Sequence, residues 1–279
     1  MTVRGHRVVP FAGQIVGVEW SGAGARDAAE LAFGGVAADD DRLPDVIFRL
    51  GTDDDSPLLT LYCGRICLYR GESIGAGAHL LLQAALDHLV RQCDAGLVIH
   101  AAVLGCGDDA LLLPGPTGSG KTMLSAWLSL RGLAPLSDEA CFLRDAESRL
   151  ESFARPFCFK GPWAELLGVA APDHRRVLQD DSVSLVPRDL FGSAPRAAAR
   201  APRLIVFPHF APDASFALDR LSPARAAVRL METVANARNL PDHGVGRVTD
   251  LARRVDTYSL TYGRFDQLAP FAALLESLA

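Results

Sequence analysis

The sequence predicts an α/β fold, with a central mixed sheet in the main domain and a smaller α+β domain at the N-terminus. Strand-like and helix-like patterns alternate along 279 residues, 49% of which are apolar, as in a globular protein. A chain of this length can bury the core of one large or two modest domains. Near residue 95 the pattern changes from short elements to long apolar strands. We therefore expect an accessory domain at 1–94 and the main domain at 95–279.

The first 94 residues alternate short strands and helices. Strands are expected at 13–19, 46–50, 58–62 and 65–69, and helices at 25–33 and 78–93. In the longer helix Leu82, Leu86 and Leu89 fall on one face, which predicts that this face is buried. No pattern in this part of the chain indicates chemistry, which favours a packing or docking role.

The main domain contains longer apolar runs. Strands are expected at 97–104, 110–114, 133–136, 140–143, 203–208 and 257–262, and helices at 121–130, 222–236, 245–255 and 265–278. The first strand is apolar except for His100, which is typical of a strand buried on both faces. Gly132 ends the first helix, and Ser222 followed by Pro223 starts the second.

A complete phosphate-binding pattern lies between the strand at 110–114 and the helix at 121–130. Its residues are Gly115, Pro116, Thr117, Gly118, Ser119, Gly120, Lys121 and Thr122. The glycines let the backbone curl so that successive N–H groups point at phosphate oxygens. Lys121 supplies a positive charge to the outer phosphates, Thr122 offers a hydroxyl to Mg²⁺, and the helix directs its positive end at the same anions. An ordinary glycine-rich turn needs no Lys-Thr at its end, so the pattern predicts nucleotide binding.

Asp138 and Glu139 follow this helix, at the end of a short apolar strand. A phosphoryl-transfer site needs a carboxylate for Mg²⁺ and gains from a second one that accepts the proton of the substrate hydroxyl. Neighbouring side chains of an extended segment point oppositely, which predicts different roles for the two acids. Ser137-Asp138-Glu139 also fits an ordinary solvated turn or a helix cap, and spacing alone does not decide between these alternatives.

His100 is the one polar residue of its predicted strand. A buried ring must find a hydrogen-bond partner, and a carboxylate such as Asp138 on a neighbouring strand is a natural one. A single histidine in an apolar strand is, however, more often a satisfied core residue than a catalytic one. Arg155, Lys160 and Arg238 are candidate contacts for a substrate or for the transferring phosphate, although such residues are more often surface charges.

The composition of the chain limits the classes of partner that we expect it to bind. The net charge of −5 gives no electrostatic reason to expect a nucleic acid. No apolar run is long enough to span a bilayer, and the first residues lack the apolar core of a signal peptide, so no membrane partner is expected. The six cysteines are scattered, mostly within apolar runs, which is typical of reduced thiols in a cytoplasmic protein. The sequence leaves open whether the chain is a homo-oligomer.

The order of these features resembles the HPr serine kinase/phosphorylase family, whose nucleotide site is related to that of phosphoenolpyruvate carboxykinase. His100 in a buried strand, the loop from Gly115 to Thr122, and Asp138 with Glu139 after the next helix carry the resemblance. It is greatest for the HPr-kinase-related branch. The resemblance implies a mixed-sheet kinase domain with a phosphate-binding loop, and the use of ATP and Mg²⁺.

The family also suggests roles for the acidic pair. By position, Asp138 would act as the general base with His100 beside it, and Glu139 would help Thr122 hold Mg²⁺. Three departures stand against HPr as the acceptor. True HPr kinases usually show two aspartates at the acidic pair, the downstream signature of the reverse reaction is not found, and the first 90 residues do not match the N-terminal domain of the bifunctional enzymes.

The function expected from the sequence is therefore an ATP-dependent kinase that transfers the γ-phosphoryl group to a hydroxyl of a protein or peptide. We expect that hydroxyl to be a serine, in a modified-peptide precursor for example. Two alternatives remain: a kinase of a small hydroxylated metabolite, and a nucleotide-binding scaffold without catalysis. The preference for ATP over GTP, the reverse reaction and the identity of the acceptor are not readable from the residues.

Overall fold

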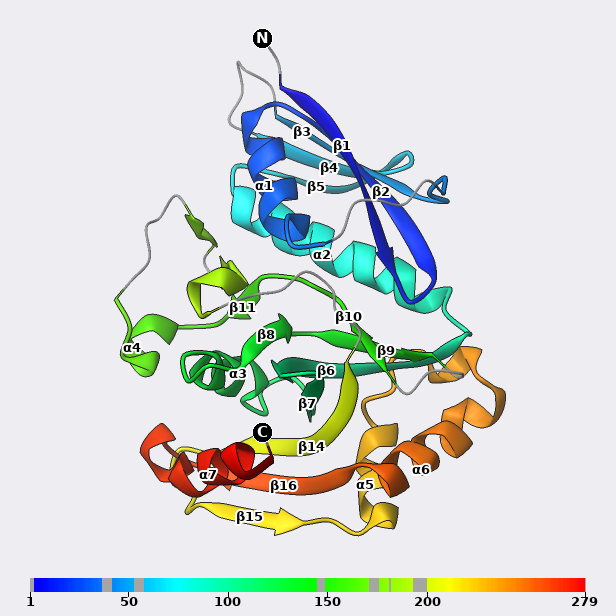
Figure 1. The fold of residues 1–279 in the computed structure, drawn as a ribbon. Helices are drawn as coiled ribbons and strands as arrows, with labels where there is room; N and C mark the ends of the chain where they lie inside the picture. The colour runs from blue at the N-terminus through cyan, green and yellow to red at the C-terminus, as the bar shows by residue number, and fades with distance from the viewer. Residues whose placement is uncertain are drawn as a thin grey trace. The chain divides into compact units, whose positions relative to one another are not determined.

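Three β-sheets and their covering helices form the described part of this chain, a mixed α/β fold (Figure 1). The structure is a computed structural model that describes residues 3–36, 42–52, 58–144, 149–170, 176–180, 182–192 and 200–278. Two of the sheets combine parallel and antiparallel pairs. The predicted α/β class with a mixed sheet is thereby confirmed. No helix within the described ranges is both long and apolar enough to cross a bilayer.

The chain divides into two compact units. The N-terminal unit combines Met1–Cys93 with Ala154–Leu190, and the C-terminal unit combines Asp94–Phe153 with Phe191–Ala279. The segment Ala154–Leu190, expected from the sequence in the main domain, thus groups with the N-terminal unit. That segment contains strands of only two or three residues, too short to show an alternating pattern.

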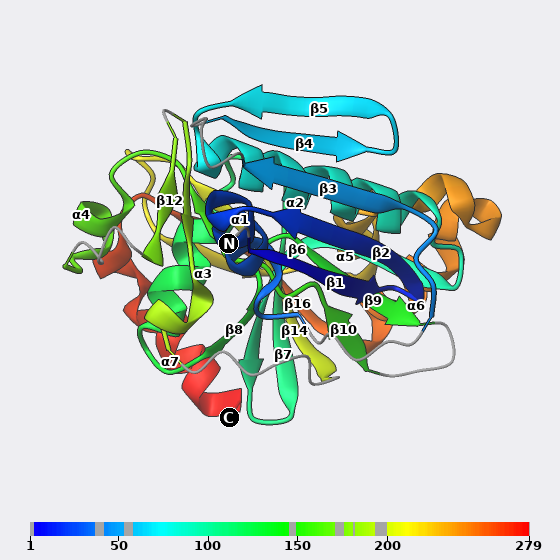
Figure 2. The ribbon, with the colours of Figure 1, turned by 90° about the horizontal axis from the view of Figure 1, so that it is seen from above.

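The five-stranded sheet of the N-terminal unit has the order β1-β2-β3-β4-β5. Its strands are β1 (Arg4–Phe11), β2 (Gln14–Ser21), β3 (Ile47–Thr52), β4 (Leu59–Cys63) and β5 (Ile66–Gly71). β2 and β3 are parallel and the other neighbours are antiparallel. Helices α1 (Ala23–Phe33) and α2 (Ile74–Arg91) pack against each other and against the sheet (Figure 2). β1 was not predicted, because its alternation of exposed and partly buried residues includes four polar or glycine positions.

The returning segment of this unit forms a small antiparallel sheet in the order β11-β13-β12. Its elements are β11 (Phe157–Phe159), α4 (Trp163–Leu167), β12 (Leu178–Gln179), β13 (Ser184–Val186) and the 3₁₀ turn η2 (Arg188–Leu190). α2 packs closely on β12: a side chain at Gly75 would place its Cβ 2.9 Å from the carbonyl carbon of Gln179. The glycine therefore permits this close approach of helix to strand.

The eight-stranded sheet of the C-terminal unit has the order β10-β9-β6-β7-β14-β16-β15, with β8 also paired to β6. Its strands are β6 (Gly96–Cys106), β7 (Asp109–Pro114), β8 (Ala134–Ser137), β9 (Ala140–Arg144), β10 (Leu150–Ser152), β14 (Ala201–Phe210), β15 (Ala217–Arg220) and β16 (Asp256–Tyr262). β7, β14 and β16 are parallel, and the remaining pairs are antiparallel.

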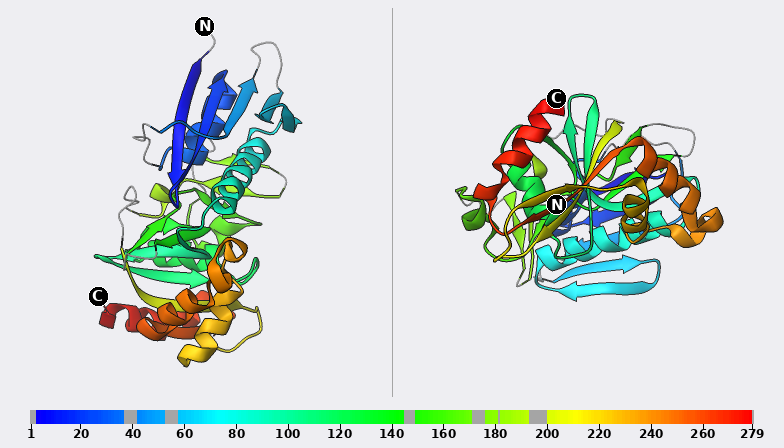
Figure 3. Two further views of the ribbon diagram at one scale, coloured as in Figure 1. Left: turned by 90° about the vertical axis from the view of Figure 1, so that its right-hand side faces the viewer. Right: turned by 90° about the horizontal axis from the view of Figure 1, so that it is seen from below.

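Both faces of β6 are buried, as its apolar sequence predicts. Leu97, Ile99, Ala101 and Val103 belong to a core cluster that also contains residues of α5 (Pro223–Met231) and α6 (Val245–Arg254). The residues of β6 that alternate with these four lie on its other face, together with His100. Helix α3 (Lys121–Ser129) packs against β6 (Figures 1 and 3). The remaining helical elements are η3 (Ala237–Asn239), η4 (Pro241–Gly244), η5 (Phe265–Leu268) and α7 (Ala269–Leu278).

The helix predicted at 222–236 ends at Met231, because the next residues bond to β6. At 96–100 the edge of β6 that faces β7 has no β7 partner, and the segment after α5 takes that place. Thr233 accepts a hydrogen bond from the backbone N–H of His100 (2.8 Å), and Ala235 donates one to Val98 (2.8 Å). The side chain of Asn236 completes this attachment through the N–H of Val98 (2.9 Å) and the carbonyl of Gly96 (2.8 Å).

We predict that Asn236→Ala destabilises this end of β6 by about 2–4 kcal/mol. The substitution leaves the buried N–H of Val98 and the buried carbonyl of Gly96 without their hydrogen-bond partner. Hydrogen exchange of peptides that cover Gly96–Cys106 measures the effect. Arg238→Ala, two residues away and exposed, is the matched control and should change stability by less than about 0.5 kcal/mol. Equal protection in the Asn236→Ala and wild-type proteins would show that the side chain does not hold the segment in place.

Candidate functional site

Strand β6 brings the two halves of the site together. Ala101 is paired with Pro114, the last residue of β7 before the phosphate-binding pattern. The N–H of the same Ala101 donates to the carbonyl of Glu139 (3.1 Å), in the turn between β8 and β9. The loop that follows β7 and the acidic turn therefore both leave the sheet next to Ala101, one at each edge of β6.

The loop between β7 and α3 is curled by residues in the left-handed region. Gly118 has φ +88° and Gly120 has φ +95°, values that side chains disfavour. The loop is tied to β14, because Phe210 donates its N–H to the carbonyl of Ser119 (3.1 Å). The hydroxyl of Ser119 is buried and has no hydrogen-bond partner within the part of the chain that the structure describes. The tip formed by Pro116, Thr117 and Gly118 is exposed, so the loop presents backbone groups to solvent.

Lys121, the first residue of α3, turns its ammonium group back into the loop. Nζ donates to the carbonyl oxygens of Gly115 (2.7 Å) and Pro116 (3.0 Å), and the residue is only 6% exposed. Burial lowers the pKa of Lys121, while the charges of Asp138 and Glu139 act in the opposite direction. A positive charge is thus held at the loop, at the N-terminal end of a helix and in the field of two carboxylates.

Thr122 and Asp138 form the second element of the site. The hydroxyl of Thr122 donates to Oδ2 of Asp138 (3.2 Å), and Asp138 is 3% exposed. A hydroxyl and a carboxylate side by side are hard oxygen ligands of the kind that Mg²⁺ prefers. No group of three or more His, Cys, Asp and Glu side chains is arranged for a metal in the described ranges. The pair therefore suits a cation that takes its other ligands from phosphates and water, as Mg²⁺ usually does.

The acidic turn is built into the sheet. β8 and β9 both pair with β6, and the turn joins them. Oγ of Ser137 accepts hydrogen bonds from the N–H groups of Glu139 and Ala140 (3.2 Å each), which fixes the backbone of the turn. Because Asp138 is buried, the alternative of an ordinary solvated turn does not hold.

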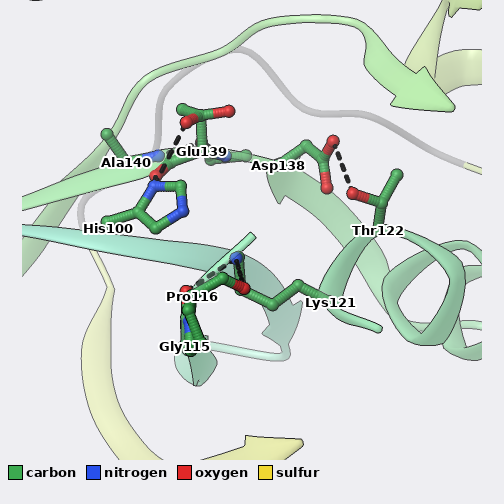
Figure 4. A network of polar contacts seen from close by, with 9 residues as sticks. His100, Gly115, Pro116, Lys121, Thr122, Asp138, Glu139 and Ala140 are labelled. Carbon is green, nitrogen blue, oxygen red and sulfur yellow. Dashed lines mark hydrogen bonds and ion pairs between the residues drawn. The ribbon is translucent and has the colours of Figure 1, made fainter. Parts of the chain in front are cut away.

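His100 pairs with Glu139. Its Nδ1 lies 3.0 Å from the carbonyl oxygen and 3.1 Å from Oε1 of that residue (Figure 4). A carbonyl oxygen cannot donate, so this contact assigns the proton to Nδ1 and leaves Nε2 with a lone pair in the neutral ring. The side chains of His100 and Glu139 are 29% and 24% exposed, which makes them accessible from solvent, in contrast to Asp138.

The two acids contact other residues than those expected from the sequence. Asp138 was predicted beside His100 and Glu139 beside Thr122, whereas Glu139 contacts His100 and Asp138 contacts Thr122. The reason is the short turn, whose two successive side chains leave the backbone on opposite sides. The two acids thus have different neighbours, and the roles of Asp138 as a base and of Glu139 as a Mg²⁺ ligand stay predictions.

The three candidate substrate contacts stay predictions. Arg238 is exposed on η3 of the C-terminal unit. Arg155 and Lys160 belong to the N-terminal unit, where Arg155 is buried and Lys160 is exposed.

Tyr262 and Phe210 support the loop and were not predicted to do so. The hydroxyl of Tyr262 donates to the carbonyl of Gly120 (3.5 Å), and its ring contacts that of Phe210, with ring centroids 5.5 Å apart. Burial raises the pKa of Tyr262, so its hydroxyl stays protonated. Gly120 and Tyr262 are 142 positions apart in the chain, and no local pattern indicates their contact.

Comparisons with known proteins give little sequence similarity. No protein-family model matches the chain. No curated protein matches it in sequence. Among solved structures, the Hpr(Ser) kinase/phosphatase from Coxiella burnetii aligns at 13% identity and a TM-score of 0.30, over 65% of this chain and 92% of that one. That TM-score is low, so the likeness carries no argument about function.

We predict that Gly120→Ala destabilises the C-terminal unit more than Gly118→Ala does. Both positions have a positive φ, which costs an alanine about 1 kcal/mol or more. At Gly120 the new Cβ would also lie 2.8 Å from the hydroxyl of Tyr262 and 2.9 Å from Cβ of Phe210, whereas nothing lies within 4 Å at Gly118. Urea denaturation of both variants measures the difference in the free energy of unfolding. Equal losses of stability would mean that contact with the two aromatic residues adds no cost at position 120.

Proposed function

We propose that this chain is an ATP-dependent phosphotransferase that moves the γ-phosphoryl group to a hydroxyl of a peptide or protein. The observation that carries the proposal is the convergence on β6 of a curled loop with a buried lysine and a turn with two acids. Each acid has its own partner, Thr122 for one and His100 for the other. A phosphate-binding loop alone needs neither pair, whereas phosphoryl transfer uses both a cation site and a base.

The loop supplies the nucleotide site. Its left-handed glycines and the start of α3 would offer backbone N–H groups to the β- and γ-phosphates of ATP. The ammonium of Lys121, now bonded to two loop carbonyls, is the cation that would contact the phosphates. Its burial strengthens any such contact, because water screens it less.

Thr122 and Asp138 would hold Mg²⁺. When bound, the ion would neutralise charge on the phosphates of the nucleotide. Asp138 contributes a negative charge that is already fixed by the hydroxyl of Thr122 and by the turn around Ser137. This arrangement needs little rearrangement of the protein, which favours catalysis by preorganised groups.

His100 is the group that we propose as general base, with Glu139 as its positioning residue. Nε2 carries the lone pair, and the contacts of Nδ1 with Glu139 orient the ring and stabilise the imidazolium that forms. The hydroxyl of the acceptor gives its proton to Nε2 as its oxygen bonds to the γ-phosphorus. The bond from that phosphorus to the β–γ bridging oxygen breaks, and ADP leaves. Asp138 is less suited to accept this proton, because it is buried against Thr122.

The acceptor is proposed to be a serine of a peptide or protein, on the strength of the resemblance described for the sequence. Transfer from ATP labelled at the γ-phosphate, in the presence of Mg²⁺ and a size-fractionated cell extract, tests the function. The proposal expects label in the peptide or protein fraction. Label confined to small molecules would indicate a metabolite kinase, and no transfer to any fraction would contradict phosphoryl transfer and favour a scaffold.

We predict that His100→Gln lowers kcat by about 10²–10⁴-fold and leaves the KM for ATP nearly unchanged, because it removes the base but not the loop. Asp138→Asn should instead raise the Mg²⁺ concentration needed for the half-maximal rate. Steady-state kinetics at several Mg²⁺ concentrations separates the two effects. A fully active His100→Gln enzyme, together with an Asp138→Asn enzyme that loses turnover but keeps its response to Mg²⁺, would return the base role to Asp138.

A further inference from the structure

A thiol, an imidazole and a carboxylate lie together in the N-terminal unit, and phosphoryl transfer uses none of them. Sγ of Cys158, on β11, lies 3.7 Å from Nε2 of His79, on α2. Both residues are partly exposed. The carboxylate belongs to Asp180, which follows β12 in the same small sheet.

The sequence of β11 directs the thiol toward α2. Phe157 and Phe159 are each 1% exposed, and their ring centroids are 5.4 Å apart. Phe159 also stacks on Trp163, at 4.7 Å. Since side chains alternate along a strand, two buried aromatic anchors on one face fix Cys158 on the other. The contact with His79 therefore depends on packing and not on a flexible cysteine rotamer alone.

The carboxylate of Asp180 is held by its own turn. Oδ1 accepts hydrogen bonds from the N–H of Ser182 (2.6 Å), the hydroxyl of Ser182 (2.8 Å) and the N–H of Val183 (2.8 Å). Burial tends to raise the pKa of Asp180, but these hydrogen bonds and the charge of His79 outweigh it and hold the pKa below its usual value. Asp180 thus carries a negative charge that would stabilise a proton taken up by His79.

We propose that Cys158 is an activated thiol, a site of covalent modification by low-molecular-weight disulfides. His79 accepts the proton of the thiol, and Asp180 stabilises the resulting imidazolium. The Cys158 thiolate then attacks one sulfur of the disulfide: a new S–S bond forms to Cys158, the old S–S bond breaks, and the other half leaves as a thiolate. A second thiol reverses the reaction by the same exchange.

The other cysteines of the chain supply internal controls. Burial raises the pKa of the Cys141 thiol to about 12, so this residue should be inert. Cys67 is exposed, and its thiol contacts the carbonyl of Tyr69 (3.4 Å) and not an imidazole. If exposure alone set reactivity, Cys67 would react before Cys158. Activation by His79 predicts the opposite order.

The test measures modification of the full-length protein by glutathione disulfide at pH 7, with each cysteine quantified by peptide mass spectrometry. We predict that Cys158 reacts about tenfold faster than Cys67, as expected for a thiol ionised to a larger extent at neutral pH. His79→Gln should remove this advantage and leave the rate at Cys67 unchanged. A Cys67 that reacts faster than Cys158 in the wild-type protein, or a His79→Gln protein that keeps the fast rate, would overturn the proposal.

A second measurement separates activation from access. His79 from α2 contacts the thiol, and the charge of Asp180, from the turn after β12, acts on His79. At pH 9.5 exposed thiols are ionised without help from a base, so the wild-type and His79→Gln proteins should react at Cys158 with similar rates. If the variant stays slow at that pH, the substitution has altered the packing around β11, and a base role for His79 is rejected.

Discussion

The pairing of β6 with its neighbours is the constraint on which the site depends. This strand is bonded to β7 along one edge and to β8 and β9 along the other. At Ala101 the two pairings overlap, so the loop after β7 and the turn between β8 and β9 have to start from the same place in the sheet. The register of one buried strand thus sets the separation of the phosphate-binding loop from the acids.

Burial of both faces makes that register specific. A shift of β6 by one residue would turn His100 toward the core cluster and would turn Ile99 and Ala101 out of it, to the loop side. The imidazole would then lose Glu139, and a polar ring without a partner in an apolar core is costly. The apolar run that the sequence shows around His100 therefore defines where the imidazole lies.

Opposing electrostatic effects act on the charged groups of the site. Lys121 is buried, which disfavours its charge, yet two loop carbonyls and the nearby Asp138 and Glu139 favour it. Each carboxylate has a donor of its own, Thr122 or His100. Groups that are already oriented need not reorganise during a reaction, which supports the proposed catalytic role.

Local sequence patterns predicted most of the C-terminal unit. The strand, loop and helix around Lys121 follow from glycine spacing and apolar runs, and the acidic turn follows from the break between two short strands. The exchange of partners between Asp138 and Glu139 was not predicted, because it depends on which side each residue of a two-residue turn faces. The contact of Tyr262 with Gly120 and the return of Ala154–Leu190 to the N-terminal unit depend on pairings distant in sequence, which local patterns do not encode.

Titration calorimetry with ATP and Mg²⁺ tests the central claim, that this loop and its lysine bind a nucleoside triphosphate. The informative pair is the wild-type protein and Lys121→Met, which keeps the length of the side chain but removes its charge. We predict one ATP bound per chain, with an affinity about tenfold to a hundredfold weaker in the variant, as expected for the loss of a hydrogen-bonded charge. Folded wild-type protein that takes up no nucleotide, or a Lys121→Met protein that binds as tightly as the wild type, would contradict the claim.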